Sequence, residues 1–148
     1  MITWDVRKDT DIYDPACLQS IWLRILEDED KWYLNYNVRI RSNDAFSAYF
    51  MNSFGITMMV KELIADEIAK RTGKEVLLGR MNWQADSWHV YGKDRDAFDA
   101  FVKKCFSWNA DSSFEDRVYN FYDKDIQEIY NEAEADIIKK IEATRKTF

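Results

Sequence analysis

The stretch that decides the fold is residues 32–55, "WYLNYNVRIRSNDAFSAYFMNSFG". Its first part alternates, and this period of two predicts a strand with one apolar face and one polar face. The apolar face carries Leu34, Tyr36, Val38 and Ile40, and the polar face carries Tyr33, Asn35, Asn37, Arg39 and Arg41. The polar residues 42–44 follow, and an apolar stretch then predicts a helix over about 50–71.

The flanking segments predict further strands around this one. Residues 16–25, "ACLQSIWLRI", are apolar and β-prone, and the charged segment 26–31 reads as the turn of a hairpin. Residues 75–83 and 87–92 are interpreted as two strands or as one bulged strand. Gly73 is a good C-terminal stop for the long helix.

Two more helices are expected after the strands. One begins near Asp94, a good N-cap, and places Cys105 on its apolar stripe. The last begins near Asp125, where Glu128 completes a capping box, and the segment between the two helices is a polar loop. With no linker or repeat in view, the pattern predicts one α+β domain over 1–148, with a mixed, twisted sheet and helices packed on one face.

Composition argues against several classes of function. The formal net charge is −6 over 148 residues, which argues against binding a nucleic acid polymer. No stretch has the length or apolarity of a signal peptide or a membrane span, and the two cysteines form no disulfide framework, so we expect a cytoplasmic protein. A single histidine excludes a multi-histidine metal site within the chain, and we expect no metal.

Several residues carry chemistry but have an ordinary structural explanation when taken singly. Cys17 is a candidate nucleophile or a small buried strand residue, and Arg41 with Ser42 is a phosphate-binding pair or a solvated or salt-bridged group. Asn52 is a reader of a pyrimidine edge or a helix N-cap. His89 and Tyr91 share a strand face, where they could bind sugar hydroxyls or serve only the structure.

The order of these residues resembles that of the thymidylate synthase family, which includes the pyrimidine hydroxymethylases. The matching motifs are "DPACL" at 14–18, "RSNDAFSAYFMN" at 41–52 and "HVY" at 89–91, within a resemblance that covers about 14–105. It implies a thymidylate synthase-like fold and a methyltransferase that moves a one-carbon unit from 5,10-methylenetetrahydrofolate to C5 of dUMP. Because family members are longer, the chain is also interpreted as the C-terminal portion of such a protein, with 107–148 left unaligned.

The resemblance implies a role for each matching residue. Cys17 would add to C6 of the uracil ring, with Arg41 favouring the thiolate, and Asn52 would hold the pyrimidine edge. The remaining substrate contacts would come from Arg41 and Ser42 to the phosphate, Asp44 to the base, and His89 and Tyr91 to the ribose. Asp44 would also bind the pterin of the folate.

The resemblance further implies a homodimer formed through the sheet. Two other hypotheses stay open beside the methyltransferase and the related dUMP hydroxymethylase. One is a non-catalytic or regulatory module that binds a deoxynucleotide. The other is an assembly domain whose polar strand face packs on a partner.

Overall fold

The computed structural model describes residues 1–107 and 118–145. The chain divides into two compact units, residues 1–103 and residues 104–148. The first unit begins with a short helix, α1 (Val6–Asp9), whose N-terminal N–H of Arg7 is capped by the side chain of Asp5. The candidate residues all lie in this first unit.

The hairpin predicted from the alternating pattern is present. Strand β1 (Leu18–Asp28) pairs antiparallel with β2 (Lys31–Ile40). The expectation of a turn over 26–31 was wrong in extent, because both strands continue into it and the turn is formed by residues 29 and 30 alone. Glu29 takes the left-handed conformation, with φ of 54°, which lets so short a turn reverse the chain.

Strand β4 (Val76–Ala85) completes a mixed sheet with the order β1-β2-β4 and lies parallel to β2. The register between β2 and β4 shifts, so that Gly79 and Arg80 of β4 lie opposite the single residue Asn35 of β2. The Oδ1 atom of Asn35 accepts a hydrogen bond of 2.6 Å from the backbone N–H of Arg80. Of the two interpretations of 75–83 and 87–92, the one with two strands is confirmed, because β4 is a bulged strand that ends at Ala85 and residues 88–89 form a separate strand.

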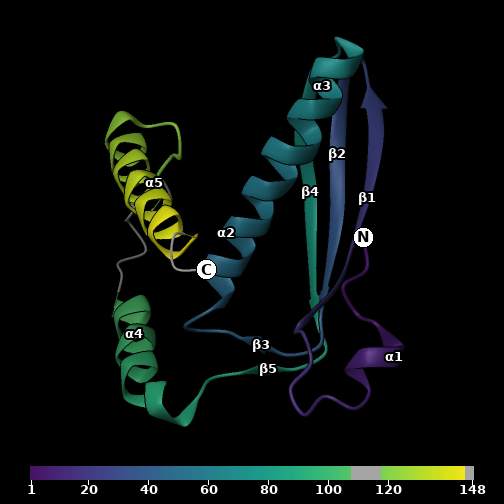
Figure 1. Cartoon of the computed structure of the whole chain (residues 1–148). Coiled ribbons are helices and arrows are strands. Elements are labelled where there is room, and N and C mark those ends of the chain that lie inside the picture. Colours follow the sequence, from purple (N-terminus) through teal and green to yellow (C-terminus); the bar gives the residue numbers. More distant parts are fainter. Residues whose placement is uncertain (108–117, 146–148) are drawn as a thin grey trace. The chain divides into compact units, whose positions relative to one another are not determined.

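One long helical segment packs on a single face of this sheet (Figure 1). It comprises α2 (Tyr49–Val60), the π-helical turn η1 (Lys61–Ala65) and α3 (Asp66–Thr72), close to the expected 50–71. Gly73 ends it with φ of 70°, and its N–H donates to the carbonyl of Ala69 at 2.8 Å. A left-handed residue is needed at this cap, which explains the glycine.

The core lies between this helix and the inward face of the sheet. It contains Ile21, Leu34, Tyr36, Val38, Ile40, Val60, Ala65 and Val76. The apolar residues of this segment favour a helix that is buried on most sides, but Met51 and Leu63 are 67% and 71% exposed. A helix on one face of a sheet buries a single stripe, and these two residues lie outside it.

A polar junction connects the sheet to the next helix. Strand β3 (Asn43–Asp44) pairs in parallel with β5 (Trp88–His89), and the chain continues through the short 3-10 helix η2 (Gly92–Asp94) into α4 (Arg95–Ser107). Asp94 was expected to cap α4, but it ends η2 and accepts a hydrogen bond from the Ser47 hydroxyl. Phe46 packs edge-on against Phe98 of α4, with ring centroids 5.6 Å apart.

The second unit contains helix α5 (Lys124–Arg145), which begins one residue before the expected start. Its first turn carries an ion pair of 3.6 Å between Lys124 and Glu128. Phe121 packs edge-on against Tyr130 of this helix, with ring centroids 5.3 Å apart. Among the helices of the described residues, none combines the length and apolarity that crossing a bilayer requires.

Candidate functional site

Cys17 and Asn52 line one cavity of about 440 Å³, although they are far apart in the sequence. Cys17 was expected inside a strand but lies just before β1, where it is exposed. Its carbonyl accepts a hydrogen bond of 2.9 Å from the backbone N–H of Arg41, which continues the hairpin ladder beyond the strand ends. The other lining residues are Leu18, Ile40, Met51, Gly55, Ile56 and Met59.

Asn52 does not cap the long helix, in contrast to the structural alternative considered for it. The helix begins at Tyr49 with Ala48 as its N-cap, and the N–H of Asn52 donates to the carbonyl of Ala48 at 2.9 Å. Within the described residues the carboxamide of Asn52 has no hydrogen-bond partner. Gly55, Ile56 and Met59 follow it at helical spacing and complete one wall of the cavity.

The guanidinium of Arg41 is held by the segment that precedes Cys17. Its Nη2 atom lies 2.5 Å from Oδ1 of Asp14, and its Nε atom donates to the carbonyl of Pro15 at 3.2 Å. The Arg41 side chain is largely covered, whereas that of Asp14 is exposed. Arg41 therefore fixes the loop that carries the thiol, and its charge is already paired with a carboxylate.

The four other candidate residues gather at the junction of β3 and β5. The Ser42 hydroxyl lies 3.3 Å from Nδ1 of His89, and the rings of His89 and Tyr91 meet edge-on with centroids 4.8 Å apart. Oδ1 of Asp44 accepts the backbone N–H groups of Ser47 and Phe46, each at 3.0 Å.

These hydrogen bonds act on the charge of Asp44. The backbone N–H of Ser47 makes the largest contribution to lowering the pKa of its carboxyl, and the N–H of Phe46 and the positive charges of His89 and Lys93 act in the same direction. Arg41, Ser42, Asp44, His89 and Tyr91 are all absent from the lining of the cavity that holds Cys17 and Asn52. The candidates thus form two groups, which the backbone of residues 41 and 42 connects.

One buried polar residue of the junction, Asn43, was not among the candidates predicted from the sequence. Asn43 is only 2% exposed, and its Nδ2 donates to the carbonyl of Asp44 at 3.2 Å. Its Oδ1 has no partner among the described residues, and neither does the buried Nε1 of Trp83. Nothing in the pattern of the strand signals this burial, because Asn43 follows the point where the alternation ends.

No family model, no curated protein and no solved structure matches this chain. The class of protein is therefore described by its own geometry. It is an α+β domain with a mixed sheet, a helix on one face, and one largely apolar cavity whose lining includes an exposed thiol and a carboxamide.

Proposed function

We propose that this chain is a pyrimidine-nucleotide-binding domain with thiol chemistry of the thymidylate synthase type. The observation that supports it is the shared cavity of Cys17 and Asn52. A thiolate is a strong nucleophile, and a carboxamide offers the donor and the acceptor that the edge of uracil requires. A volume of about 440 Å³ lies within the range of sites for one small ligand, which here would be dUMP.

The proposed reaction begins with addition of the Cys17 sulfur to C6 of the uracil ring. The S–C6 bond forms, the electron pair of the C5–C6 double bond moves to C5 and the C4 carbonyl, and the thiol proton leaves to water. Asn52 donates a hydrogen bond to the O4 atom as negative charge develops there. C5 then takes a proton from water, and expulsion of the thiolate with loss of one C5 hydrogen restores the ring. These residues thus account for exchange of the C5 hydrogen with solvent.

The motif order also predicts methylenetetrahydrofolate as a one-carbon donor, with thymidylate or its hydroxymethyl analogue as product. The described residues around the cavity do not fit this group. Their lining contains no aromatic side chain on which a pterin could stack. Asp44, the residue expected at the pterin, lies outside the lining, and its Oδ1 already accepts hydrogen bonds from the backbone of Phe46 and Ser47. One-carbon transfer from folate and the homodimer therefore stay predictions of the motif order.

Binding of the nucleotide phosphate by Arg41 requires an exchange of partners. The guanidinium would release the exposed carboxylate of Asp14 and take the phosphate in its place. Exposed ion pairs contribute about 0–1 kcal/mol, so a phosphate held by two guanidinium hydrogen bonds can compete with Asp14. Ser42 follows Arg41 directly and would supply its hydroxyl to the same phosphate.

The test is exchange of the C5 hydrogen of dUMP in deuterated water, followed by mass spectrometry of the nucleotide. We expect exchange with the unchanged chain and with Cys105→Ser, a control thiol on α4, and none with Cys17→Ser. Thermal stabilisation by dUMP that Cys17→Ser leaves intact, without exchange, supports the non-catalytic module instead. If dUMP shows neither exchange nor thermal stabilisation, nucleotide binding is refuted. An adduct of 5-fluoro-dUMP that forms only with methylenetetrahydrofolate would restore the folate role.

A further inference from the structure

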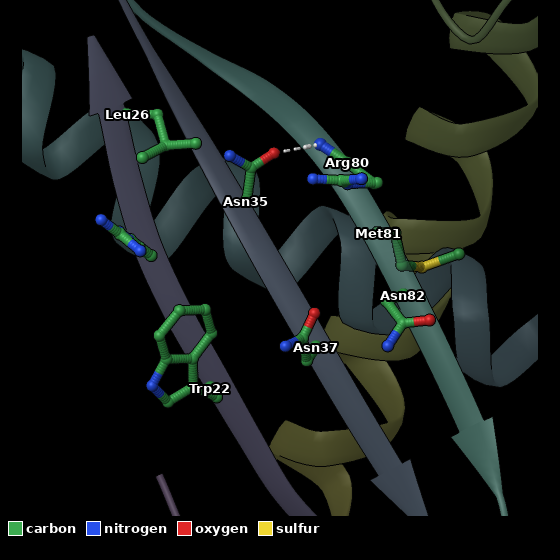
Figure 2. A pocket seen from close by; sticks show the side chains of 8 residues that line it. Trp22, Leu26, Asn35, Asn37, Arg80, Met81 and Asn82 are labelled. Atoms are coloured by element: carbon green, nitrogen blue, oxygen red, sulfur yellow. Dashed lines mark hydrogen bonds between the residues drawn. The ribbon is translucent and has the colours of Figure 1, made fainter.

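The outward face of the sheet, opposite the long helix, carries an unusual set of side chains. A hollow of about 340 Å³ lies on it, lined by residues of β1, β2 and β4 (Figure 2). Trp22 of β1 is 53% exposed there, and Arg24 of β1 and Arg80 of β4 are also exposed. Asn35, Asn37 and Asn82 supply amide groups to the same hollow.

The strand register arranges these side chains in two rows across the sheet. Trp22 pairs with Asn37, and Asn37 pairs with Asn82, which gives a row of one aromatic ring and two amides. Arg24 pairs with Asn35, which lies opposite the Arg80 bulge, and this gives a neighbouring row of two cations around an amide. Rows two residues apart along a strand are separated by about 7 Å, the scale of one nucleotide.

The charge of this hollow is opposite to that of the chain. The net charge of −6 argues against a polyanionic ligand, but no carboxylate lines the hollow within the described residues. Arg39 and Lys31, also on outward positions, are paired with Asp86 and Glu75. By contrast, Arg24 and Arg80 form no ion pair in the part of the chain that the structure describes, so both cations are available to a ligand.

We propose that this face binds single-stranded nucleic acid. One base would stack on Trp22, the amides of Asn37 and Asn82 would bond to base edges, and Arg24 and Arg80 would hold phosphates. The neighbouring hollow toward the hairpin turn is lined by Glu27 and Asp28, which repel phosphate and limit the bound segment to a few nucleotides. A two-fold dimer through this face would bring the free cations of both copies into one interface, which disfavours it as the occupant.

The test is fluorescence anisotropy of labelled oligo(A) of about ten nucleotides, a length within the range of small single-strand sites. Adenine is chosen because the Cys17 cavity is assigned to a pyrimidine, so failure of that site leaves this result unaffected. We expect Trp22→Ala to weaken binding at least about fivefold and Trp22→Phe to retain most of it. If two phosphates are neutralised, a plot of the logarithm of affinity against the logarithm of salt concentration should have a slope of about −1.4. Arg24→Gln and Arg80→Gln should each reduce this slope by about half.

Matched controls make the result specific to the face. Arg71→Gln changes an exposed arginine of α3, and Cys17→Ser changes the other site; both should bind oligo(A) as the unchanged chain does. The proposal is overturned if oligo(A) does not bind at millimolar protein. It is also overturned if Trp22→Ala and both arginine variants bind oligo(A) as tightly as the unchanged chain does. Tighter binding of polyglutamate with the same variant dependence overturns it too and identifies an acidic protein partner. Sedimentation showing a dimer that Trp22→Ala dissociates assigns the face to a second copy instead.

Discussion

Replacing Gly79 with alanine tests the bulge that sets the register of β4. A Cβ atom at this position would lie 2.4 Å from Oδ1 and 3.1 Å from Cγ of Asn35. The carbonyl of Leu34 would be 3.4 Å away, an ordinary contact, so the backbone has no need to shift. The Asn35 side chain must therefore rotate, and in doing so it gives up its hydrogen bond to the N–H of Arg80 (Figure 2).

The cost follows from the groups that change. Loss of the hydrogen bond costs about 1 kcal/mol, and displacement of Asn35 from its preferred rotamer costs about 0.5–1.5 kcal/mol. Against this, alanine restricts the unfolded chain and contributes about 0.4–1 kcal/mol of stability. Gly79 is not among the residues with positive φ, so backbone strain adds nothing. Gly79→Ala should lower the free energy of unfolding by about 1 kcal/mol, within a range of about 0.5–2 kcal/mol.

A double-mutant cycle in urea separates the clash from other effects. In an Asn35→Ala background there is no carboxamide to displace, so Gly79→Ala should be neutral or stabilising by up to about 1 kcal/mol. The sign of the effect thus reverses between the two backgrounds. Equal destabilisation by Gly79→Ala in both backgrounds would refute the reasoning, because the cost would then arise from the backbone and not from Asn35.

Three other predictions concern the site and the core. Asp14→Asn removes the carboxylate paired with Arg41 and, if Arg41 binds phosphate, should tighten dUMP binding several-fold in isothermal titration; weaker or unchanged binding contradicts the exchange of partners. Asp44→Asn should destabilise the fold at pH 7, because the charged carboxylate is stabilised in the folded state, where its pKa lies below the ordinary 3.8. That stability is lost as the pH falls through the lowered pKa, so the difference in unfolding temperature between the unchanged chain and Asp44→Asn should shrink below about pH 4. A difference that stays constant with pH contradicts the lowered pKa of Asp44. Val60→Ala opens a cavity in the core and should cost about 2 kcal/mol in urea unfolding, whereas the control Leu63→Ala, on the exposed side of the same helix, should cost under about 0.5 kcal/mol; equal costs contradict the one-sided packing.

Much of the first unit could be predicted because its signals are local. Alternation over 32–41 identified β2 and the face it buries, since Leu34, Tyr36, Val38 and Ile40 all lie in the core. Gly73 identified the end of the long helix, because the cap needs a left-handed residue. The exposure of Met51 and Leu63 could not be predicted, since it depends on a sheet that covers only one side of the helix.

The candidate site, too, could be predicted from the sequence only in part. The motif order singled out Cys17 and Asn52, and the structure brings both to one cavity. The same order assigned Arg41 to a phosphate, yet its partner in the fold is Asp14, a pairing that no spacing rule predicts. The burial of Asn43 depends on β3 pairing with β5, two strands too short to carry a pattern of their own.

By itself, the sequence determined the hairpin, the helix after it and the residues able to carry thiol and amide chemistry, because these depend on neighbours within a few positions. Only the tertiary structure decided the parallel pairing of β4 with β2, the bulge at Gly79 and the pairing of Arg41 with Asp14. It also decided the hollow that places Arg24 and Arg80 together on the outward face of the sheet, although the chain is acidic. Each of these joins segments distant in the chain, where register, packing and charge pairing depend on the whole fold.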